Sequence, residues 1–217
     1  MSAHGRRAIA DRALRFFPAL HARAQIHLLA NTLSTAGALM RRRPDVAEDL
    51  LAQFVTYLRE LLGTTRPLVP LTEELRLVLV FIGVERARMG GRLRLEVACT
   101  AESRDAFVPP LVLQPLVENA IRHGIARRPM GGRIRISGRV AGATLHLAVV
   151  DDGPGLRRAQ AAGSGTGWGL SSVRLRLAAL CGPTARLRLL GRPDSGTLAA
   201  ISLPALLAPG RRFGTGP

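Results

Sequence analysis

The segment VPPLVLQPLVENAIRHGI, residues 108–125, carries an unusual set of polar side chains inside an apolar run. Its opening prolines and apolar spacing predict a helix over residues 109–124. The polar residues are Glu118, Asn119, Arg122 and His123. Asn119 and His123 are one turn apart and share a face of the predicted helix. A side-chain amide oxygen suits Mg²⁺, and Arg or His suits phosphate, but an ordinary helix with one solvated face has the same pattern.

A second segment, VVDDGPGL at residues 149–156, places two carboxylates directly after an apolar strand. Asp151 can accept the exocyclic amine of adenine, and Gly153 and Gly155 permit a close approach of the backbone. The same residues also fit an ordinary turn, because Asp-Gly is a common turn dipeptide. A Ca²⁺ loop fits less well, since the alternating oxygen ligands of an EF-hand are missing.

A third segment, GSGTGWGLSSV at residues 163–173, is a glycine-rich loop that leads directly into a predicted helix. Free backbone N–H groups and the helix dipole at such a point favour phosphate. The segment is not a dinucleotide-binding fingerprint, because it does not follow the first strand of a βαβ unit. It is not a Walker loop either, because the chain contains no lysine.

The second half of the chain alternates between strand and helix patterns. Strands are predicted over residues 93–99, 133–140, 144–152, 185–191 and 196–204, and further helices over 72–89 and 169–182. Thr72 is the predicted N-cap of the first of these helices, and Gly90-Gly91 ends it. Ala141-Gly142 is a hairpin signal. This order predicts an α+β fold in which helices pack on one face of a sheet.

The N-terminal part predicts two helices joined by a short turn. The first helix has a heptad seam made of Ile26, Leu29, Leu33, Ala36 and Met40. RRRPD at residues 41–45 breaks the helix, and a second apolar pattern runs from Val46 to Leu62. A hairpin alone buries little apolar surface, so we expect two chains to pair into a four-helix bundle. His27 and Asn31 share a face beside the seam.

Composition limits the possible partners. The chain has 217 residues, 47% of them hydrophobic, and a formal net charge of +16, which fits a folded protein attractive to polyanions. All 31 basic residues are arginine, so Schiff-base chemistry on lysine is excluded. The arginines are spread along the chain with only short clusters such as Arg41–Arg43, which favours a solvated surface over a nucleic-acid groove.

Neither a disulfide framework nor a membrane span is predicted. Cys99 and Cys181 lie far apart without paired spacing, so a zinc site is not indicated either. The N-terminus has no long apolar region, and no stretch approaches 18 uninterrupted apolar residues. We therefore expect a cytoplasmic protein.

The order ENAIRHG, DDGPG, GTGWGL resembles the nucleotide-binding boxes of the Bergerat-type ATP-binding fold of histidine kinases and gyrases. Residues 108–125 are similar to the LytS-type sensor histidine kinases, whose core carries the string PPxxLQPLVENAIKHG. LTEELRLVLVFIGVERARMGGRL is similar to that family's helix leading into the ATP domain. LHARAQIHLLANTLS aligns without a gap with its phosphoacceptor motif LxAQINPHFLFNTLN. The resemblance covers roughly residues 20–203.

The resemblance implies a kinase that uses ATP and Mg²⁺. His27 falls on the family's phosphorylated histidine and Asn31 on its asparagine. Glu118 would orient or deprotonate His27, and Asn119 would coordinate Mg²⁺. The remaining residues that the resemblance places at the nucleotide are Arg122, His123, Asp151, Gly153, Gly155, Gly165, Gly167, Gly169, Leu170 and Thr197, with residues 157–166 as a lid.

The resemblance also implies an organisation and partners. A dimerisation and phosphoacceptor hairpin would span residues 1–66, and a connecting helix 67–92. An ATP-binding α/β sandwich would span 93–207, followed by a tail at 208–217. The expected partners are a second copy of the chain and the receiver domain of a response regulator.

Two alternatives stay open. A degenerate kinase would bind ATP without transferring phosphate, because Ile26, Leu28 and Ala30 replace a proline and two phenylalanines of the family's phosphoacceptor motif. A basic, dimeric scaffold or nucleic-acid-binding protein would instead require a contiguous arginine stripe, which the linear sequence does not show.

Overall fold

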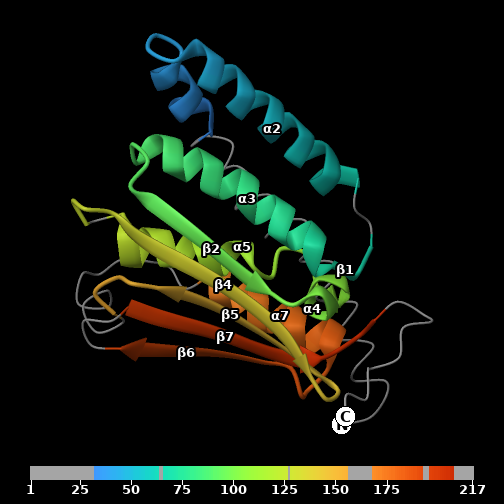
Figure 1. The fold of residues 1–217 in the computed structure, drawn as a ribbon. Coiled ribbons are helices and arrows are strands. Elements are labelled where there is room, and N and C mark those ends of the chain that lie inside the picture. The colour runs from blue at the N-terminus through green and yellow to red at the C-terminus, as the bar shows by residue number, and fades with distance from the viewer. Residues whose placement is uncertain (1–31, 64–65, 127, 156–167, 193–195, 208–217) are drawn as a thin grey trace.

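The computed structural model describes residues 32–63, 66–126, 128–155, 168–192 and 196–207 (Figure 1). Its centre is a five-stranded sheet in the order β2-β4-β5-β7-β6. The strands are β2 (Leu93–Cys99), β4 (Gly132–Ala141), β5 (Thr144–Asp151), β6 (Arg186–Arg192) and β7 (Gly196–Pro204). β2 and β4 are parallel, and the other pairs are antiparallel. The predicted strands are therefore confirmed to within a residue or two.

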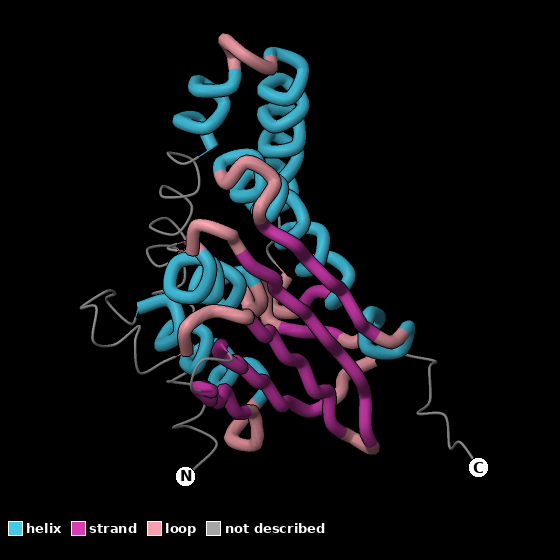
Figure 2. The backbone as a smooth tube through the Cα atoms, turned by 60° about the vertical axis from the view of Figure 1, so that its left-hand side comes forward, coloured by secondary structure: helices cyan, strands magenta, loops and turns pink. Residues whose placement is uncertain are grey.

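Helices cover one face of this sheet (Figures 1 and 2). They are α3 (Leu71–Arg88), α5 (Gln114–Asn119), the π-helix η1 (Ala120–Ile125) and α7 (Trp168–Cys181). Alternate strand residues such as Ile134, Ile136 and Leu145 point into the core between the two layers and are completely buried. The predicted α+β architecture, with helices on one face of the sheet, is confirmed.

Two small elements were not predicted. The short helix α4 (Ala101–Asp105) follows β2, and its N-terminus is capped by the Thr100 hydroxyl, which accepts a hydrogen bond from the Ser103 N–H. The strands β1 (Val69–Pro70) and β3 (Phe107–Val108) form a separate antiparallel pair. These segments are too short for periodicity to reveal them.

The N-terminal part of the described chain is a helical hairpin. Residues 32–39 are helical, residues 40–42 form the turn, and α2 (Pro44–Gly63) returns alongside. The predicted break at residues 41–45 is confirmed, with Pro44 as the first residue of α2. Ala36 and Leu50 of the hairpin pack against Val84 of α3.

Two sequence predictions about helix starts were wrong. α3 begins at Leu71 with Pro70 as its N-cap, and the Thr72 hydroxyl donates to the Arg104 carbonyl instead. The helix predicted from residue 109 begins only at Gln114. Residues 111–113 are not helical because their N–H groups bond to a side chain of α3, a tertiary contact that helical periodicity cannot reveal.

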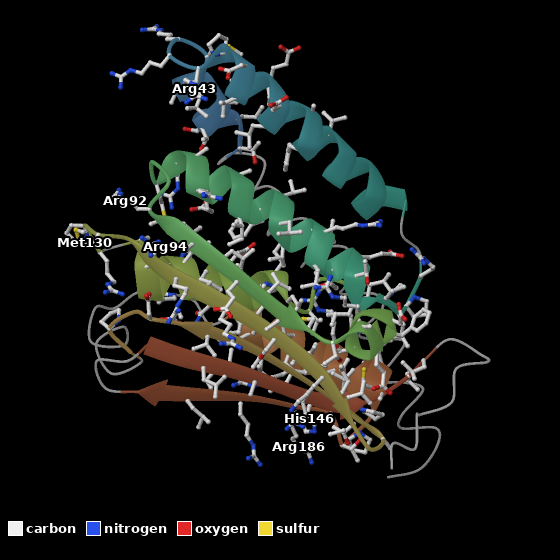
Figure 3. The ribbon with its side chains drawn as sticks, in the orientation of Figure 1. Arg43, Arg92, Arg94, Met130, His146 and Arg186 are labelled. Carbon is white, nitrogen blue, oxygen red and sulfur yellow. The ribbon has the colours of Figure 1, made fainter. Side chains whose placement is uncertain are left out.

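The other face of the sheet is uncovered by the described segments. Its exposed side chains include Arg94, Arg133, Arg135, Arg139, Arg186 and Arg188, of which Figure 3 labels Arg94 and Arg186. Strand alternation gathers on one surface arginines that are spread in sequence. Within the described part of the chain, no helix is long and apolar enough to cross a membrane.

Candidate functional site

Asp151 is the last residue of β5 and lies almost fully buried, with 3% of its surface exposed. Its carboxylate accepts hydrogen bonds from the Gly153 N–H at 2.9 Å and from the N–H and hydroxyl of Thr197. Burial raises the pKa of Asp151, and the negative charge of Asp152 raises it further. The hydrogen bonds from Gly153 and Thr197 lower the same pKa. The structure thus brings the predicted residues Asp151, Gly153 and Thr197 together.

The neighbouring Asp152 has a different role. Its Oδ1 accepts the Arg133 N–H at 2.9 Å and the Arg128 guanidinium at 3.0 Å. Arg128 also donates to the Asp152 carbonyl. These bonds tie Asp152 to the start of β4, which leaves Asp151 as the carboxylate that faces the helical layer.

The ENAIRHG motif contacts Asp151 through Gly124, and two further glycines approach Asp151 as closely. A Cβ added to Gly124 would lie 2.4 Å from Asp151 Oδ1, and one added to Gly153 would lie 2.3 Å from the Gly124 Cα. Gly196 has φ +92°, and its Cβ would lie 1.7 Å from the Asp151 carbonyl oxygen. The backbone therefore approaches the carboxylate more closely than any side chain would allow. Gly124 and Gly196 were missed as site residues, although Gly124 lies within the ENAIRHG motif.

The helix that carries the polar motif changes its winding at the site. α5 passes at Ala120 into the π-helix η1, where the Ala126 N–H donates to the Ile121 carbonyl at 2.8 Å. A π-turn is rare and is frequently found at functional sites. The segment Ala120–Ile125, predicted as part of an α-helix, is therefore π-helical instead.

The polar side chains of this helix differ in exposure. Arg122 is exposed, while Glu118, Asn119 and His123 are partly buried. Glu118 Oε1 accepts a hydrogen bond from Gln114 Nε2 at 2.9 Å. Burial raises the pKa of Glu118, the Gln114 bond and the Arg122 charge lower it, and Glu85 of α3 raises it.

Gly155, in the second motif, is buried with φ +81°, a conformation that suits glycine. The third motif is described only in part. Gly169 and Leu170 lie in the first turn of α7, and Leu170 packs against the core. Gly165, Gly167, and the predicted lid over 157–166 lie outside the described residues, as do His27 and Asn31.

The described residues include no group of three or more His, Cys, Asp or Glu side chains that could hold a metal ion. The partly buried Asn119 amide fits Mg²⁺ in another way, because Mg²⁺ commonly takes one or two protein oxygens and completes its shell with phosphates and water. The site therefore offers a buried carboxylate (Asp151), a partly buried amide (Asn119) and an exposed guanidinium (Arg122) to a ligand that carries phosphate and Mg²⁺.

Two family models match the chain. One is described as "Histidine kinase" and matches residues 17–93. The other is described as "Histidine kinase-, DNA gyrase B-, and HSP90-like ATPase" and matches residues 109–207. Together they include every predicted site residue.

Named relatives agree with the family models. The sensor histidine kinase BtsS of Escherichia coli (strain K12) is 34% identical over 185 residues, covering 85% of this chain and 32% of BtsS. The sensor histidine kinase/phosphatase LytS of Staphylococcus aureus (strain Mu50) is 32% identical over 196 residues, covering 85% of this chain and 33% of LytS. The chain thus spans about a third of the length of these curated relatives.

A solved structure, the Acinetobacter baumannii histidine kinase AdeS, is 19% identical, covers 85% of this chain and 97% of that chain, and has a TM-score of 0.49.

Proposed function

Because the chain belongs to the LytS-type histidine kinases, we propose that it is an ATP-dependent protein-histidine kinase of a two-component system. The observation that carries the proposal is the contact between the Gly124 backbone and the Asp151 carboxylate. It joins the helix bearing Asn119 to the strand bearing Asp151, so that one ligand can reach both.

The proposed roles at the nucleotide follow from burial and charge. Asp151, held by Gly153 and Thr197, would accept the adenine amine. Asn119 would hold Mg²⁺, which when bound would supply positive charge to neutralise the phosphates. The positive charge of Arg122 would face the phosphates, together with His123. We also assign Gly155, Gly165, Gly167, Gly169 and Leu170 to the nucleotide site on the basis of the family motif.

The proposed reaction moves the γ-phosphoryl group of ATP to His27. An imidazole nitrogen of His27 forms a bond to the γ-phosphorus while the bond to the ADP oxygen breaks. Glu118 takes the proton that the imidazole loses. We assign Asn31 to the same group on the basis of the family motif, in which it follows His27 by four residues. The raised pKa of Glu118 suits a general base, because it brings the carboxylate closer to the operating pH.

We further propose the organisation that the family implies. Residues 1–66 would form the dimerisation and phosphoacceptor hairpin, 67–92 the connecting helix, 93–207 the ATP-binding domain and 208–217 a tail. The phosphoryl group would pass to an aspartate of a response regulator. ATP as the substrate supports placing this part of the protein in the cytoplasm.

The experiment is autophosphorylation of the purified chain with γ-labelled ATP and Mg²⁺. We expect an acid-labile, base-stable label that His27→Gln abolishes without loss of nucleotide binding. Asn119→Ala should lose nucleotide-dependent stabilisation, which for ligand at about 100 times its dissociation constant is ~2.7 kcal/mol in the unaltered protein. A label that survives in His27→Gln would disprove the histidine assignment.

A further inference from the structure

Glu74, in the first turn of α3, is completely buried and has no place in the predicted site. Its carboxylate accepts three backbone hydrogen bonds from consecutive residues. Oε1 accepts the Leu111 N–H at 2.6 Å, and Oε2 accepts the N–H groups of Val112 and Leu113 at 2.8 and 3.1 Å. Charge-assisted bonds of this kind are about twice as strong as neutral ones.

The three bonded residues lead directly into α5, the helix that ends at Asn119. Leu111 has φ +54° although it is not glycine, and it is buried. A non-glycine residue persists in this conformation only where its surroundings hold it there. The Glu74 carboxylate supplies that restraint, because it fixes the Leu111 N–H and the two that follow.

A second buried charge extends the contact to α7. Arg176 of α7 is 6% exposed, and its positive charge acts on Glu74. Its guanidinium donates to the Pro110 carbonyl at 2.8 Å and to the Ser172 hydroxyl at 3.1 Å. Glu74 and Arg176 therefore hold the same loop from two helices. The first turn of α7 contains Gly169 of the third motif.

α3 also contacts the hairpin. Val84 lies ten residues after Glu74 in the same continuous helix and packs against Ala36 and Leu50 of the hairpin. The two residues therefore move together as parts of one rigid element. One end of α3 thus contacts the hairpin, and the other contacts the start of the Asn119 helix.

We propose that Glu74 is a positioning residue for the nucleotide site. Glu74 holds the start of α5 in a fixed position relative to α3, and through Arg176 it holds α7 in the same way. A movement of α3 therefore also displaces the amide of Asn119. The inference rests on the proposed function, because it takes Asn119 as the residue that holds Mg²⁺.

The test separates two parts of nucleotide affinity. A non-hydrolysable ATP analogue is titrated into the full chain with Mg²⁺ and again with EDTA. Glu74→Gln cannot accept three N–H bonds and removes the charge beside Arg176. We expect it to lose the Mg²⁺-dependent gain in affinity by about tenfold or more, as for other residues that support metal ligands. Affinity in EDTA should stay unchanged, because Asp151 lies on β5.

Glu73→Gln is the matched control. It removes the same charge one residue earlier, from an exposed ion pair with Arg66 at 2.7 Å. Both affinities should remain those of the unaltered protein. Glu74→Asp keeps the charge on a side chain that is one methylene shorter. It should lose less of the Mg²⁺-dependent gain in affinity and keep its affinity in EDTA. It serves as the test if Glu74→Gln does not fold.

The results that overturn the inference are distinct from those that overturn the function. If the unaltered chain gains affinity with Mg²⁺ and both Glu74 variants retain that gain, Glu74 does not position the site. A parallel loss of affinity with and without Mg²⁺ would show a structural role only. If the unaltered chain does not bind the analogue, the proposed function fails, and the inference fails with it.

Discussion

At the scale of single residues, the Asp151 carboxylate, which we propose binds adenine, depends on neighbours that have no side chain. Asp151 is wedged between the backbones of Gly124, Gly153 and Gly196, and each of these glycines would place a Cβ within 2.7 Å of an Asp151 atom. A Cβ atom does not approach other heavy atoms this closely, so any substitution must displace the carboxylate or the backbone beside it. The glycines therefore set the position of Asp151 as much as its hydrogen bonds do.

Gly196→Ala should lower the free energy of unfolding by about 3 kcal/mol or more, because the added Cβ meets the Asp151 carbonyl and φ is +92°. Gly142→Ala is the matched control. It also has positive φ, +56°, but open space around the Cβ, so it should cost only about 1 kcal/mol. Urea unfolding followed by circular dichroism measures both values. Equal losses would show that backbone strain, and not contact with Asp151, limits position 196.

At the scale of elements, the helix at residues 114–125 combines a buried start, a polar middle and a π-turn. Gln114 is 3% exposed and bonds to Glu118 one turn later, so the start of the helix controls the proposed base. Arg122 and Glu85 act on the same carboxylate with opposite effects on its pKa. The reactivity of Glu118 is thus a property of this helix and α3 together.

Gln114→Leu should move the pH dependence of autophosphorylation upward. The Gln114 bond lowers the pKa of Glu118, so its removal raises that pKa. Glu118 must be ionised to accept a proton, and the rate should therefore begin to fall at a higher pH as the solution is acidified. Initial rates between about pH 5.5 and 8.5 measure the midpoint. Glu96→Gln, on the open face, should leave it unchanged, and an unshifted midpoint in Gln114→Leu would argue against Glu118 as the base.

At the scale of the whole molecule, some side chains of the predicted heptad seam are buried within the chain and others are exposed. Ala36 is 2% exposed and packs inside the hairpin, whereas Leu33 and Met40 are 53% and 59% exposed. Leu33 lies on the first helix and Met40 in the turn that follows it, and apolar side chains this exposed fit a surface that a second chain covers. The same hairpin thus packs on α3 through one side and offers the other for pairing.

We expect the unaltered chain to be a dimer and the double variant Leu33→Glu with Met40→Glu to be a monomer, because pairing would bury unpaired carboxylates. Light scattering after size-exclusion chromatography measures the mass. Leu190→Glu is the control, because Leu190 is comparably exposed, at 52%, but lies on β6. A double variant that remains dimeric would place the interface elsewhere.

Local patterns predicted the regular elements well and the irregular ones poorly. Period-two alternation found all five strands of the large sheet, and glycines marked the turns at Gly90, Gly142 and Gly182, each with positive φ. Thr72 failed as a cap because Pro70 is the N-cap, and the Thr72 hydroxyl bonds to Arg104, far away in sequence. The start of α5 was misplaced because the Glu74 carboxylate, 37 residues upstream of Leu111, takes the N–H groups of the loop.

The amino-acid sequence by itself determined the α+β class and the order of the elements, because periodicity and residue type act over short stretches of chain. Only the tertiary structure decided that Asp151 and not Asp152 faces the helices, that Gly124 and Gly196 enclose it, and that Glu74 and Arg176 hold the start of α5. It also gathered the scattered arginines on one open face of the sheet. These are contacts between distant segments, which depend on how the layers pack and therefore leave no periodic trace in the sequence.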